Sequence, residues 1–369
     1  MSRTHSSTLV IFAIMLSACQ SQAGTGTLQP IPTEPVQQPT QAAQPTPQPT
    51  RTAAVQATAQ PTGIPPAPLQ PISPENAGDL QELFKIHEFA NTIAYTPDSS
   101  QILAGAIDRT LRLFSAADGT PGMVIRGLDG YVFGVAVSPD GSMFGSATSD
   151  RLLQLWDAES GELLHTLEGH YQDATSIAFS PDSSKVIGGS FDQRVIAWDT
   201  ATGERLYTTV RSPGYLNSVA WFPDGNRIAS GAGMGEVRVY DAHTGRWTRG
   251  MSAHTDWVRS IAVSPDGVWI AAGAENNEVW LYDSAKGWLI AAMKGHEGYV
   301  NSVAFSPDGS LLASGAIDGT VRLWQVADAS AVTVLDGFDG YVVSVTFSPD
   351  GKQLAVASDR GYIHVFGVK

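Results

Sequence analysis

The chain has 369 residues, 43% of them apolar, and a formal net charge of −14, so it can bury a substantial core in one to three domains. A chain this acidic is repelled by nucleic acids and by anionic membrane surfaces, which argues against both as partners. It has a single cysteine, Cys19, which excludes an internal disulfide and leaves packing to supply the stability.

The first 18 residues have the pattern of a secretory signal. Arg3 precedes the short apolar run TLVIFAIML, which extends from Thr8 to Leu16. This run is too short to cross a bilayer as a helix, which takes about 20 residues. A basic start, an apolar centre and small residues at the end are typical of a signal peptide.

The end of this segment, Leu16-Ser17-Ala18-Cys19, resembles the lipobox of bacterial lipoproteins. The resemblance implies that residues 1–18 are a lipoprotein signal peptide and that Cys19 becomes the lipid-attachment residue. Acyl chains on Cys19 would anchor the chain to a membrane. We therefore expect an extracytoplasmic protein, on the cell surface or the periplasmic face, and the sequence leaves open which membrane carries it. An ordinary signal with an incidental cysteine is the alternative.

The segment that follows is predicted to be a tether. Residues 20–74 are rich in Pro, Gln, Thr and Ala, and their only charged residues are Glu34 and Arg51. Such a composition buries too little apolar surface to offset its ordering entropy. We expect residues 19–74 to be a disordered spacer behind the lipid.

Beyond residue 79 the chain is periodic. A Pro-Asp pair recurs every 42 residues without insertion or deletion, at Pro97, Pro139, Pro181, Pro223, Pro265, Pro307 and Pro349. A fixed period near 40 residues indicates a repeat architecture.

One unit illustrates the strands. VNSVAFS (residues 300–306), LLASGA (311–316), TVRLWQ (320–325) and AVTVLDG (from 331) read as strands separated by turns such as Asp308-Gly309. Four short strands every 42 residues predict an all-β fold, a seven-bladed β-propeller of four-stranded antiparallel blades over residues 79–369.

The two ends of the repeat region predict how the ring closes. The last unit has only three strands, and GDLQELFKIHE (residues 78–88) supplies the missing outer strand from the amino-terminal side. We expect this strand to complete the last blade and so remove the exposed edges. Leu83 falls at the repeat position of other outer-strand residues, namely Ile125, Leu167, Met251, Met293 and Leu335.

Residues 295–325, GHEGYVNSVAFSPDGSLLASGAIDGTVRLWQ, resemble a WD repeat, and Trp156-Asp157 and Trp198-Asp199 carry the dipeptide itself. The resemblance covers residues 79–369. It implies a structural tetrad within each blade, which is complete in one unit as His296, Ser314, Asp318 and Trp324.

Other units depart from the tetrad. The third unit has His170, Asp192 and Trp198, but Gly188 stands where the hydroxyl belongs. Further units replace the Asp or the Trp, and we expect them to lack the buried polar network and to rely on apolar packing. The replacements are Met234, Asn276, Phe114, Tyr240, Tyr282 and Phe366.

The sequence offers no catalytic or metal-binding pattern. It contains no HExxH, Walker loop, GxSxG or cysteine ligand set. His170, His254 and His296 belong to three different units, so they are not expected to share a metal. We predict that the protein is not an enzyme and takes no metal or cofactor.

An aromatic residue precedes most inner strands. We call the seven positions the crown: Phe89, Tyr131, Asp173, Tyr215, Trp257, Tyr299 and Tyr341. Two further repeated positions, one at the strand start and one before the tetrad Asp, add polar and apolar neighbours. In WD-repeat proteins these positions face one end of the ring and form its usual contact surface. The predicted binding residues are Phe89, Tyr131, Phe191, Tyr215, Trp257, Arg259, Glu275, Tyr299, Asn301 and Tyr341.

These observations favour a membrane-anchored scaffold, a monomeric propeller that binds a protein or peptide on its crown. A glycan-binding module that uses the same aromatic rings is the second hypothesis, and an enzyme of another propeller family is the third. The rings could instead pack on neighbouring blades. The sequence names no partner and does not fix the oligomeric state.

Overall fold

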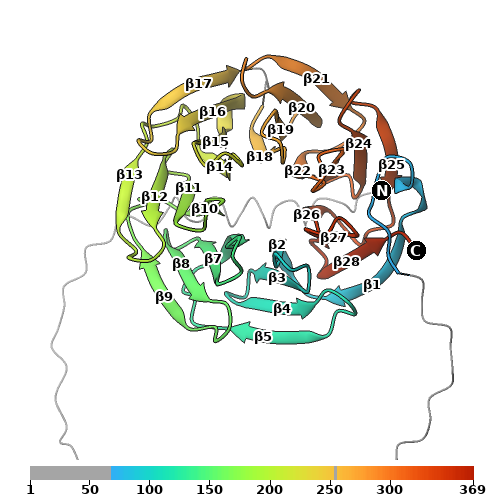
Figure 1. Cartoon of the computed structure of the whole chain (residues 1–369), viewed down its shortest axis with the longest axis horizontal. Coiled ribbons are helices and arrows are strands. Elements are labelled where there is room, and N and C mark those ends of the chain that lie inside the picture. The colour runs from blue at the N-terminus through green and yellow to red at the C-terminus, as the bar shows by residue number, and fades with distance from the viewer. Residues whose placement is uncertain (1–67, 253–255) are drawn as a thin grey trace, which may run out of the picture. The chain divides into compact units, whose positions relative to one another are not determined.

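The computed structural model describes residues 68–252 and 256–369, which form seven four-stranded sheets arranged in a ring (Figure 1). The predicted seven-bladed, all-β propeller is therefore confirmed. The predicted signal peptide, Cys19, most of the tether and His254 lie outside the described residues. In the described part of the chain no helix is long and apolar enough to span a membrane.

Each blade is built from consecutive strands, ordered from the axis outwards. The first three blades consist of β2 (Ala90–Tyr95), β3 (Gln101–Ala106), β4 (Leu111–Ser115) and β5 (Pro121–Ile125); β6 (Val132–Val137), β7 (Met143–Thr148), β8 (Leu153–Asp157) and β9 (Leu163–Leu167); and β10 (Ala174–Phe179), β11 (Lys185–Ser190), β12 (Val195–Asp199) and β13 (Arg205–Thr208).

Blades four to six consist of β14 (Leu216–Trp221), β15 (Arg227–Ala232), β16 (Glu236–Asp241) and β17 (Trp247–Ser252); β18 (Val258–Val263), β19 (Trp269–Ala274), β20 (Glu278–Asp283) and β21 (Leu289–Lys294); and β22 (Val300–Phe305), β23 (Leu311–Ala316), β24 (Val321–Gln325) and β25 (Ala331–Leu335). Blade seven combines β26 (Val342–Phe347), β27 (Gln353–Ser358) and β28 (Tyr362–Gly367) with β1 (Gln81–His87). Two short 3₁₀ turns, η1 (Ala77–Asp79) and η2 (Gly233–Gly235), complete the described elements.

The repeated Ser-Pro-Asp-Gly segment forms the turn between the first two strands of a blade. In blade six, Ser306 Oγ donates to Asp308 Oδ1 at 2.6 Å and accepts from the Leu311 N–H at 2.9 Å. Gly309 follows with φ 73°, a backbone conformation that glycine adopts without strain. The turn therefore fixes the hairpin locally, which explains why the same residues recur in most blades.

In blades one and three a serine takes the place of this glycine. Ser99 and Ser183 both have φ 61°. Their hydroxyls accept hydrogen bonds from the neighbouring blades, from the Asp350 N–H at 3.0 Å and the Asp140 N–H at 3.1 Å respectively. A contact between blades thus offsets the cost of a left-handed non-glycine residue.

The ring closes as predicted, because β1 pairs antiparallel with β28. The expected register was wrong, however. Ile86, not Leu83, lies opposite Ile363 and is 6% exposed, whereas Leu83 falls in the irregularity between Glu82 and Phe84. No hairpin connects β28 to β1, so side-chain burial rather than repeat spacing sets the register.

The core lies between adjacent blades. The cluster between blades five and six, for example, joins Val279 and Leu281 to Val300, Leu312 and Trp324. Each blade buries its faces against its two neighbours, so no blade has a complete core without the rest of the ring.

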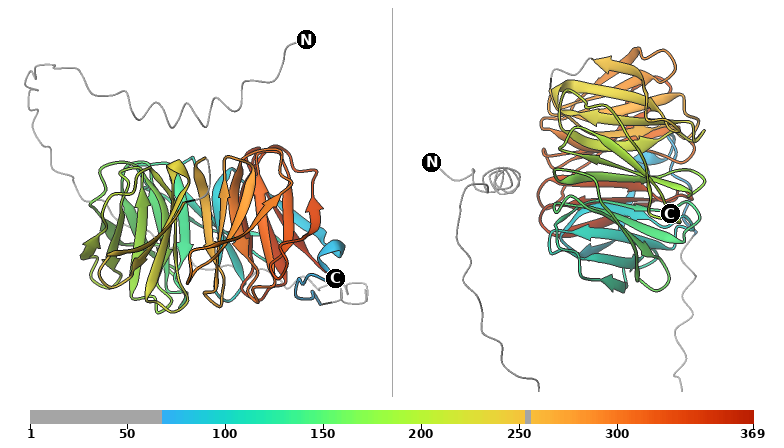
Figure 2. Two further views of the ribbon diagram at one scale, coloured as in Figure 1. Left: turned by 90° about the horizontal axis from the view of Figure 1, so that it is seen from above. Right: turned by 90° about the vertical axis from the view of Figure 1, so that its left-hand side faces the viewer.

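Seen from the side, the strands run between two ends of the ring (Figure 2). We call the end with the crown residues the crown end, and the end with the Ser-Pro-Asp-Gly turns the aspartate end. The described chain enters at the aspartate end, where the Ile72 N–H donates to the Gly351 carbonyl at 2.8 Å. Gln70 also forms a bridge with Val368, and Ile72 is buried in the core. The expectation of disorder up to residue 74 was therefore wrong for residues 70–72, which pack against blade seven.

Candidate functional site

The complete tetrad lies inside blade six. His296 Nδ1 is 2.9 Å from Asp318 Oδ2 and its Nε2 is 2.8 Å from Ser314 Oγ, which also accepts from Trp324 Nε1 at 2.8 Å. The imidazole is almost fully buried. All of these polar groups are used within the blade, which is the arrangement of a structural network.

The Asp318 carboxylate accepts several hydrogen bonds at once. Burial alone would raise its pKa, but hydrogen bonds from His296, from the Glu297 N–H and from Thr320 outweigh burial and hold the pKa well below its usual value. The carboxylate therefore stays ionised at neutral pH and stabilises the folded blade.

Blade three has the predicted gap in its tetrad. His170 Nδ1 is 2.9 Å from Asp192 Oδ2, but the buried Nε2 has no hydrogen-bond partner among the described residues. A Cβ at Gly188 would lie 2.6 Å from Leu153 Cδ2. Leu153 thus occupies the space that a serine side chain would need.

The expectation of purely apolar packing was wrong for blade four. Tyr240, in the tryptophan position, is fully buried, and its hydroxyl lies 3.1 Å from Ser212 Oγ and 3.4 Å from Ser230 Oγ. Ser212 stands in the histidine position of the repeat. Three hydroxyl groups therefore replace the tetrad with a different buried network.

The crown residues lie beside the residues that precede the tetrad Asp. In six blades the crown carbonyl accepts from the backbone N–H of the latter residue, with distances of 2.8–3.1 Å; the pairs are Tyr131–Ser149, Asp173–Phe191, Tyr215–Gly233, Trp257–Glu275, Tyr299–Ile317 and Tyr341–Asp359. The two sets of positions therefore share one end of the ring.

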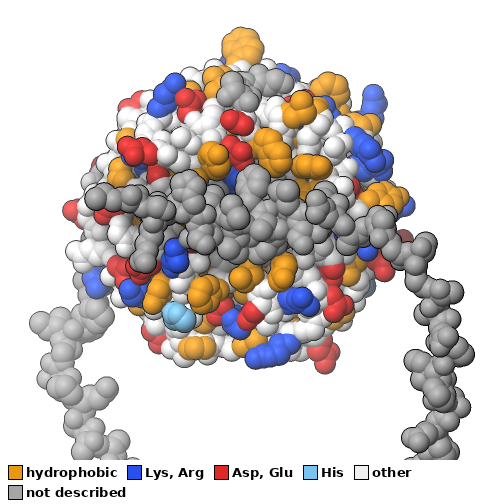
Figure 3. Space-filling view, turned by 180° about the vertical axis from the view of Figure 1, so that it is seen from behind, with side chains coloured by type: hydrophobic (Ala, Val, Ile, Leu, Met, Phe, Trp, Pro, Cys, Tyr) orange, Lys and Arg blue, Asp and Glu red, His pale blue; other side chains and the backbone are white. Residues whose placement is uncertain are grey.

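The aromatic crown residues remain accessible to solvent. Phe89 is 51% exposed, Tyr215 and Trp257 are each 37% exposed, and Tyr299 is 36% exposed. Tyr131 and Tyr341 are half-buried. One face of the ring shows hydrophobic side chains interspersed with acidic and basic ones (Figure 3). None of the crown rings is enclosed in the core.

Some crown rings also contact aromatic rings of neighbouring blades. The ring centroids of Phe191 and Tyr215 are 5.5 Å apart, and those of Tyr215 and Trp257 are 6.0 Å apart. Arg259 lies over the Tyr299 ring at 5.5 Å and forms a 2.6 Å ion pair with Glu275. The predicted binding residues of blades three to six are thus brought together.

Asn301 has a structural contact of its own. Its Nδ2 donates to the carbonyl of Val342 in the next blade at 2.9 Å. Asn91 and Asn217 make the same contact with their neighbouring blades. The side-chain amide of Asn301, a predicted binding residue, therefore forms a hydrogen bond that connects two blades.

One crown-end residue was missed as a candidate. Met234 is 71% exposed and adopts φ 68°, ψ 19° within η2. From the sequence, Met234 was noted only as a replacement of the tetrad Asp. Its position between Gly233 and Gly235 was the available signal for an unusual turn.

Two cavities lie at equivalent positions between blades at the aspartate end. One, of about 470 Å³, lies between blades two and three and is lined by Asp140, Asp157, Asp182 and His165, among others. The other, of about 620 Å³, lies between blades seven and one.

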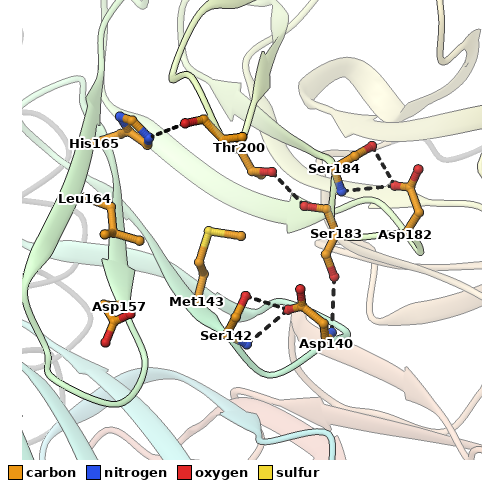
Figure 4. A pocket seen from close by; sticks show the side chains of 11 residues that line it. Asp140, Ser142, Met143, Asp157, Leu164, His165, Asp182, Ser183, Ser184 and Thr200 are labelled. Atoms are coloured by element: carbon orange, nitrogen blue, oxygen red, sulfur yellow. Dashed lines mark hydrogen bonds between the residues drawn. The ribbon is translucent and has the colours of Figure 1, made fainter.

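The polar groups of the first cavity are held by internal contacts. Figure 4 shows Thr200 Oγ1 donating to the Ser183 carbonyl at 2.7 Å and the Asp140 N–H donating to Ser183 Oγ. Hydrogen bonds from Ser180 and Ser184 lower the pKa of Asp182 to about 2. These contacts form a seam between blades rather than a catalytic arrangement.

No group of three or more His, Cys, Asp or Glu residues that could hold a metal ion occurs within residues 68–252 and 256–369.

A family model described as WD domain, G-beta repeat matches seven segments of the chain, residues 78–115, 119–157, 161–199, 203–241, 245–283, 287–325 and 329–366. The chain belongs to the WD40 repeat family. Each matched segment begins near the outer strand of one blade and ends with the third strand of the next, as the first segment does with β1 to β4. WD40 propellers typically act as non-enzymatic scaffolds for protein interactions. A comparison with curated proteins gives no match.

Proposed function

We propose that this WD40 propeller is an extracytoplasmic docking scaffold, held to a membrane by a lipid on Cys19, that binds a protein or peptide partner at its crown end. The scaffold role is typical of the family. The lipid anchor is supported by the lipobox-like ending Leu16-Ser17-Ala18-Cys19. In this proposal the chain performs no catalysis.

The exposure of the crown aromatics carries the proposal. Six of the seven crown positions are aromatic, and Phe89, Tyr215, Trp257 and Tyr299 each leave more than a third of their surface to solvent. Tyrosine and tryptophan combine apolar area with a hydrogen-bonding group, which suits them to interfaces. Packing between blades buries part of each crown aromatic side chain, and a bound partner would cover the exposed part.

Replacement of Trp257 and Tyr299 together by alanine tests the crown. A partner is first identified by affinity purification with the Cys19→Ser chain as bait, and its affinity is then measured by calorimetry. The double variant is expected to bind at least tenfold more weakly, because two exposed aromatic contacts are lost, while its thermal unfolding changes little.

Trp288 supplies the matched control, since it is 64% exposed and lies immediately before β21, away from the crown end. Trp288→Ala should bind the partner normally. A large loss of stability in the double variant with unchanged binding would support a packing role for the crown. Binding of the chain to a glycan array, lost in the double variant, would favour the second hypothesis of sugar recognition.

The anchor is tested separately by mass spectrometry of the mature protein. We expect an amino-terminal Cys19 with attached acyl chains, and release of the Cys19→Ser chain from the membrane fraction. A mature chain that begins elsewhere and carries no lipid would contradict the anchor without affecting the crown.

A further inference from the structure

Four apolar residues lie near one another at the crown end, across blades three to five, and we call them the apolar arc: Phe191, Tyr215, Met234 and Trp257. The ring contacts at 5.5 and 6.0 Å join Phe191, Tyr215 and Trp257 in a row. Met234 is connected to the row through Gly233, whose N–H donates to the Tyr215 carbonyl and whose Cβ position would be 3.6 Å from the Trp257 ring.

Met234 is the most exposed member of the arc. It occupies the tetrad Asp position of blade four, yet it is 71% exposed and contributes nothing to the buried network of that blade. Its φ of 68° is a left-handed conformation that a long side chain adopts at a cost. A strained backbone that presents an apolar, adaptable side chain to solvent is a feature of binding surfaces.

Asp173 interrupts the aromatic crown next to the arc. Its carbonyl accepts from the Phe191 N–H at 3.1 Å, which places it beside the first residue of the arc. The carboxylate is half-buried and forms no ion pair within residues 68–252 and 256–369. Burial raises its pKa and nearby Asp150 raises it further, whereas its own backbone N–H and the charge of Arg151 lower it.

A cationic group would complete this arrangement. A partly desolvated carboxylate without an ion pair gains more from a cation than an exposed one does. The net charge of −14 also attracts cations over a distance, which favours a basic ligand over an acidic one.

We propose that the apolar arc and Asp173 form one peptide-binding subsite, which takes an apolar side chain on the arc and a neighbouring lysine or arginine at Asp173. This inference rests on the proposed docking function of the crown and adds the chemistry of its ligand. The occupant is a basic, apolar peptide segment of a partner protein.

The test is a selection of random twelve-residue peptides displayed on phage, with the full Cys19→Ser chain as target. We expect enrichment of sequences that have a large apolar residue within a few positions of lysine or arginine. For a synthetic peptide from this set, Met234→Asn and Trp257→Ala should each weaken binding at least tenfold. Asparagine tolerates the left-handed conformation, so Met234→Asn keeps the fold and its thermal unfolding temperature does not fall.

Asp173 is tested with a double-mutant cycle. Asp173→Asn should weaken binding several-fold and reduce its dependence on salt, and it should have no effect on a peptide in which the basic residue is replaced by alanine. Trp288→Ala, away from the crown end, is the control and should bind normally.

Selection of acidic peptides, or of none, overturns the inference. So does a selected peptide whose binding is unchanged in both Met234→Asn and Trp257→Ala. In either case the proposed docking function is still supported if the protein captures a partner and this capture requires Trp257 and Tyr299.

Discussion

Asn301 Nδ2 donates to the Val342 carbonyl at 2.9 Å, across the boundary between blades six and seven. A second contact crosses the same boundary nearby, where the Val345 N–H donates to Ser302 Oγ at 3.0 Å. The serine contact recurs at other boundaries, with Ser176, Ser218, Ser260 and Ser344 as acceptors. Hydrogen bonds between inner strands thus connect neighbouring blades close to the axis.

Asn301→Ala should lower the free energy of unfolding by about 1 kcal/mol or somewhat more, because it removes one hydrogen bond and leaves the Val342 carbonyl unpaired. Urea denaturation measures the change. Asn217→Ala, which removes the equivalent bond to Val258, should cost a similar amount. Unchanged stability together with loss of partner binding would show instead that Asn301 is a ligand contact.

The tetrad gap of blade three predicts a compensating pair of substitutions. Gly188→Ser alone should destabilise the protein by about 1–3 kcal/mol, because its Cβ would overlap Leu153. Leu153→Val alone should cost about 1 kcal/mol. Together they should cost less than the sum, because the smaller side chain admits the serine, whose hydroxyl can then bond His170 Nε2.

Valine is a fitting replacement because Val279 holds the repeat position of Leu153 in the unit that precedes the complete tetrad. A double-mutant cycle from chemical denaturation gives the coupling energy. Strictly additive costs would mean that the blade has another way to accommodate the serine.

The period of 42 residues was enough to predict the number of blades, their strands and the closure by an amino-terminal strand, because packing between repeats forces equivalent residues into equivalent places. The period did not predict contacts made by a residue that differs in type from its equivalents in the other repeats. The hydroxyl network of Tyr240 needs Ser212 in a histidine position. A comparison with the family pattern shows only that the expected tryptophan and histidine are missing at these two positions.

For the candidate site, too, the sequence predicted positions in the repeat but not the contacts of individual side chains. Repeat spacing placed the crown residues at one end, but it could not show that Asn301 bonds a neighbouring blade or that Met234 protrudes into solvent. Both facts depend on side-chain direction and turn geometry. These vary within a repeat position even where the strands keep the same arrangement.

Asp318 predicts a pH dependence of stability. Its pKa is lowered in the folded state, so its contribution is complete above the unfolded value of about 3.9 and is lost as pH falls below it. Asp318→Asn should therefore cost about 1–3 kcal/mol at pH 7, and this cost should shrink steadily below about pH 4.

Urea denaturation of both proteins at pH 7, 5, 4 and 3 provides the measurement. Asp328→Asn is the control, because that carboxylate bonds only within an exposed turn, to Ser330. It should change stability much less at every pH. A cost of Asp318→Asn that stays constant down to pH 3 would contradict the assigned role of the ionised carboxylate.

The register of the closing strand separates Ile86 from Leu83. Ile86 is buried opposite Ile363, so Ile86→Ala should cost about 2–5 kcal/mol, the usual range for such a truncation in a core. Leu83 is only half-buried at the irregularity of β1, so Leu83→Ala should cost clearly less. If instead β1 followed the 42-residue spacing in solution, Leu83 would be the core residue and the order of the two costs would reverse. Ile86→Ala should also speed hydrogen exchange, first in β28 and only later in β22 or β23, because β1 is the strand that closes the ring. Equal acceleration of exchange in all blades would show instead that ring opening and global unfolding are one event.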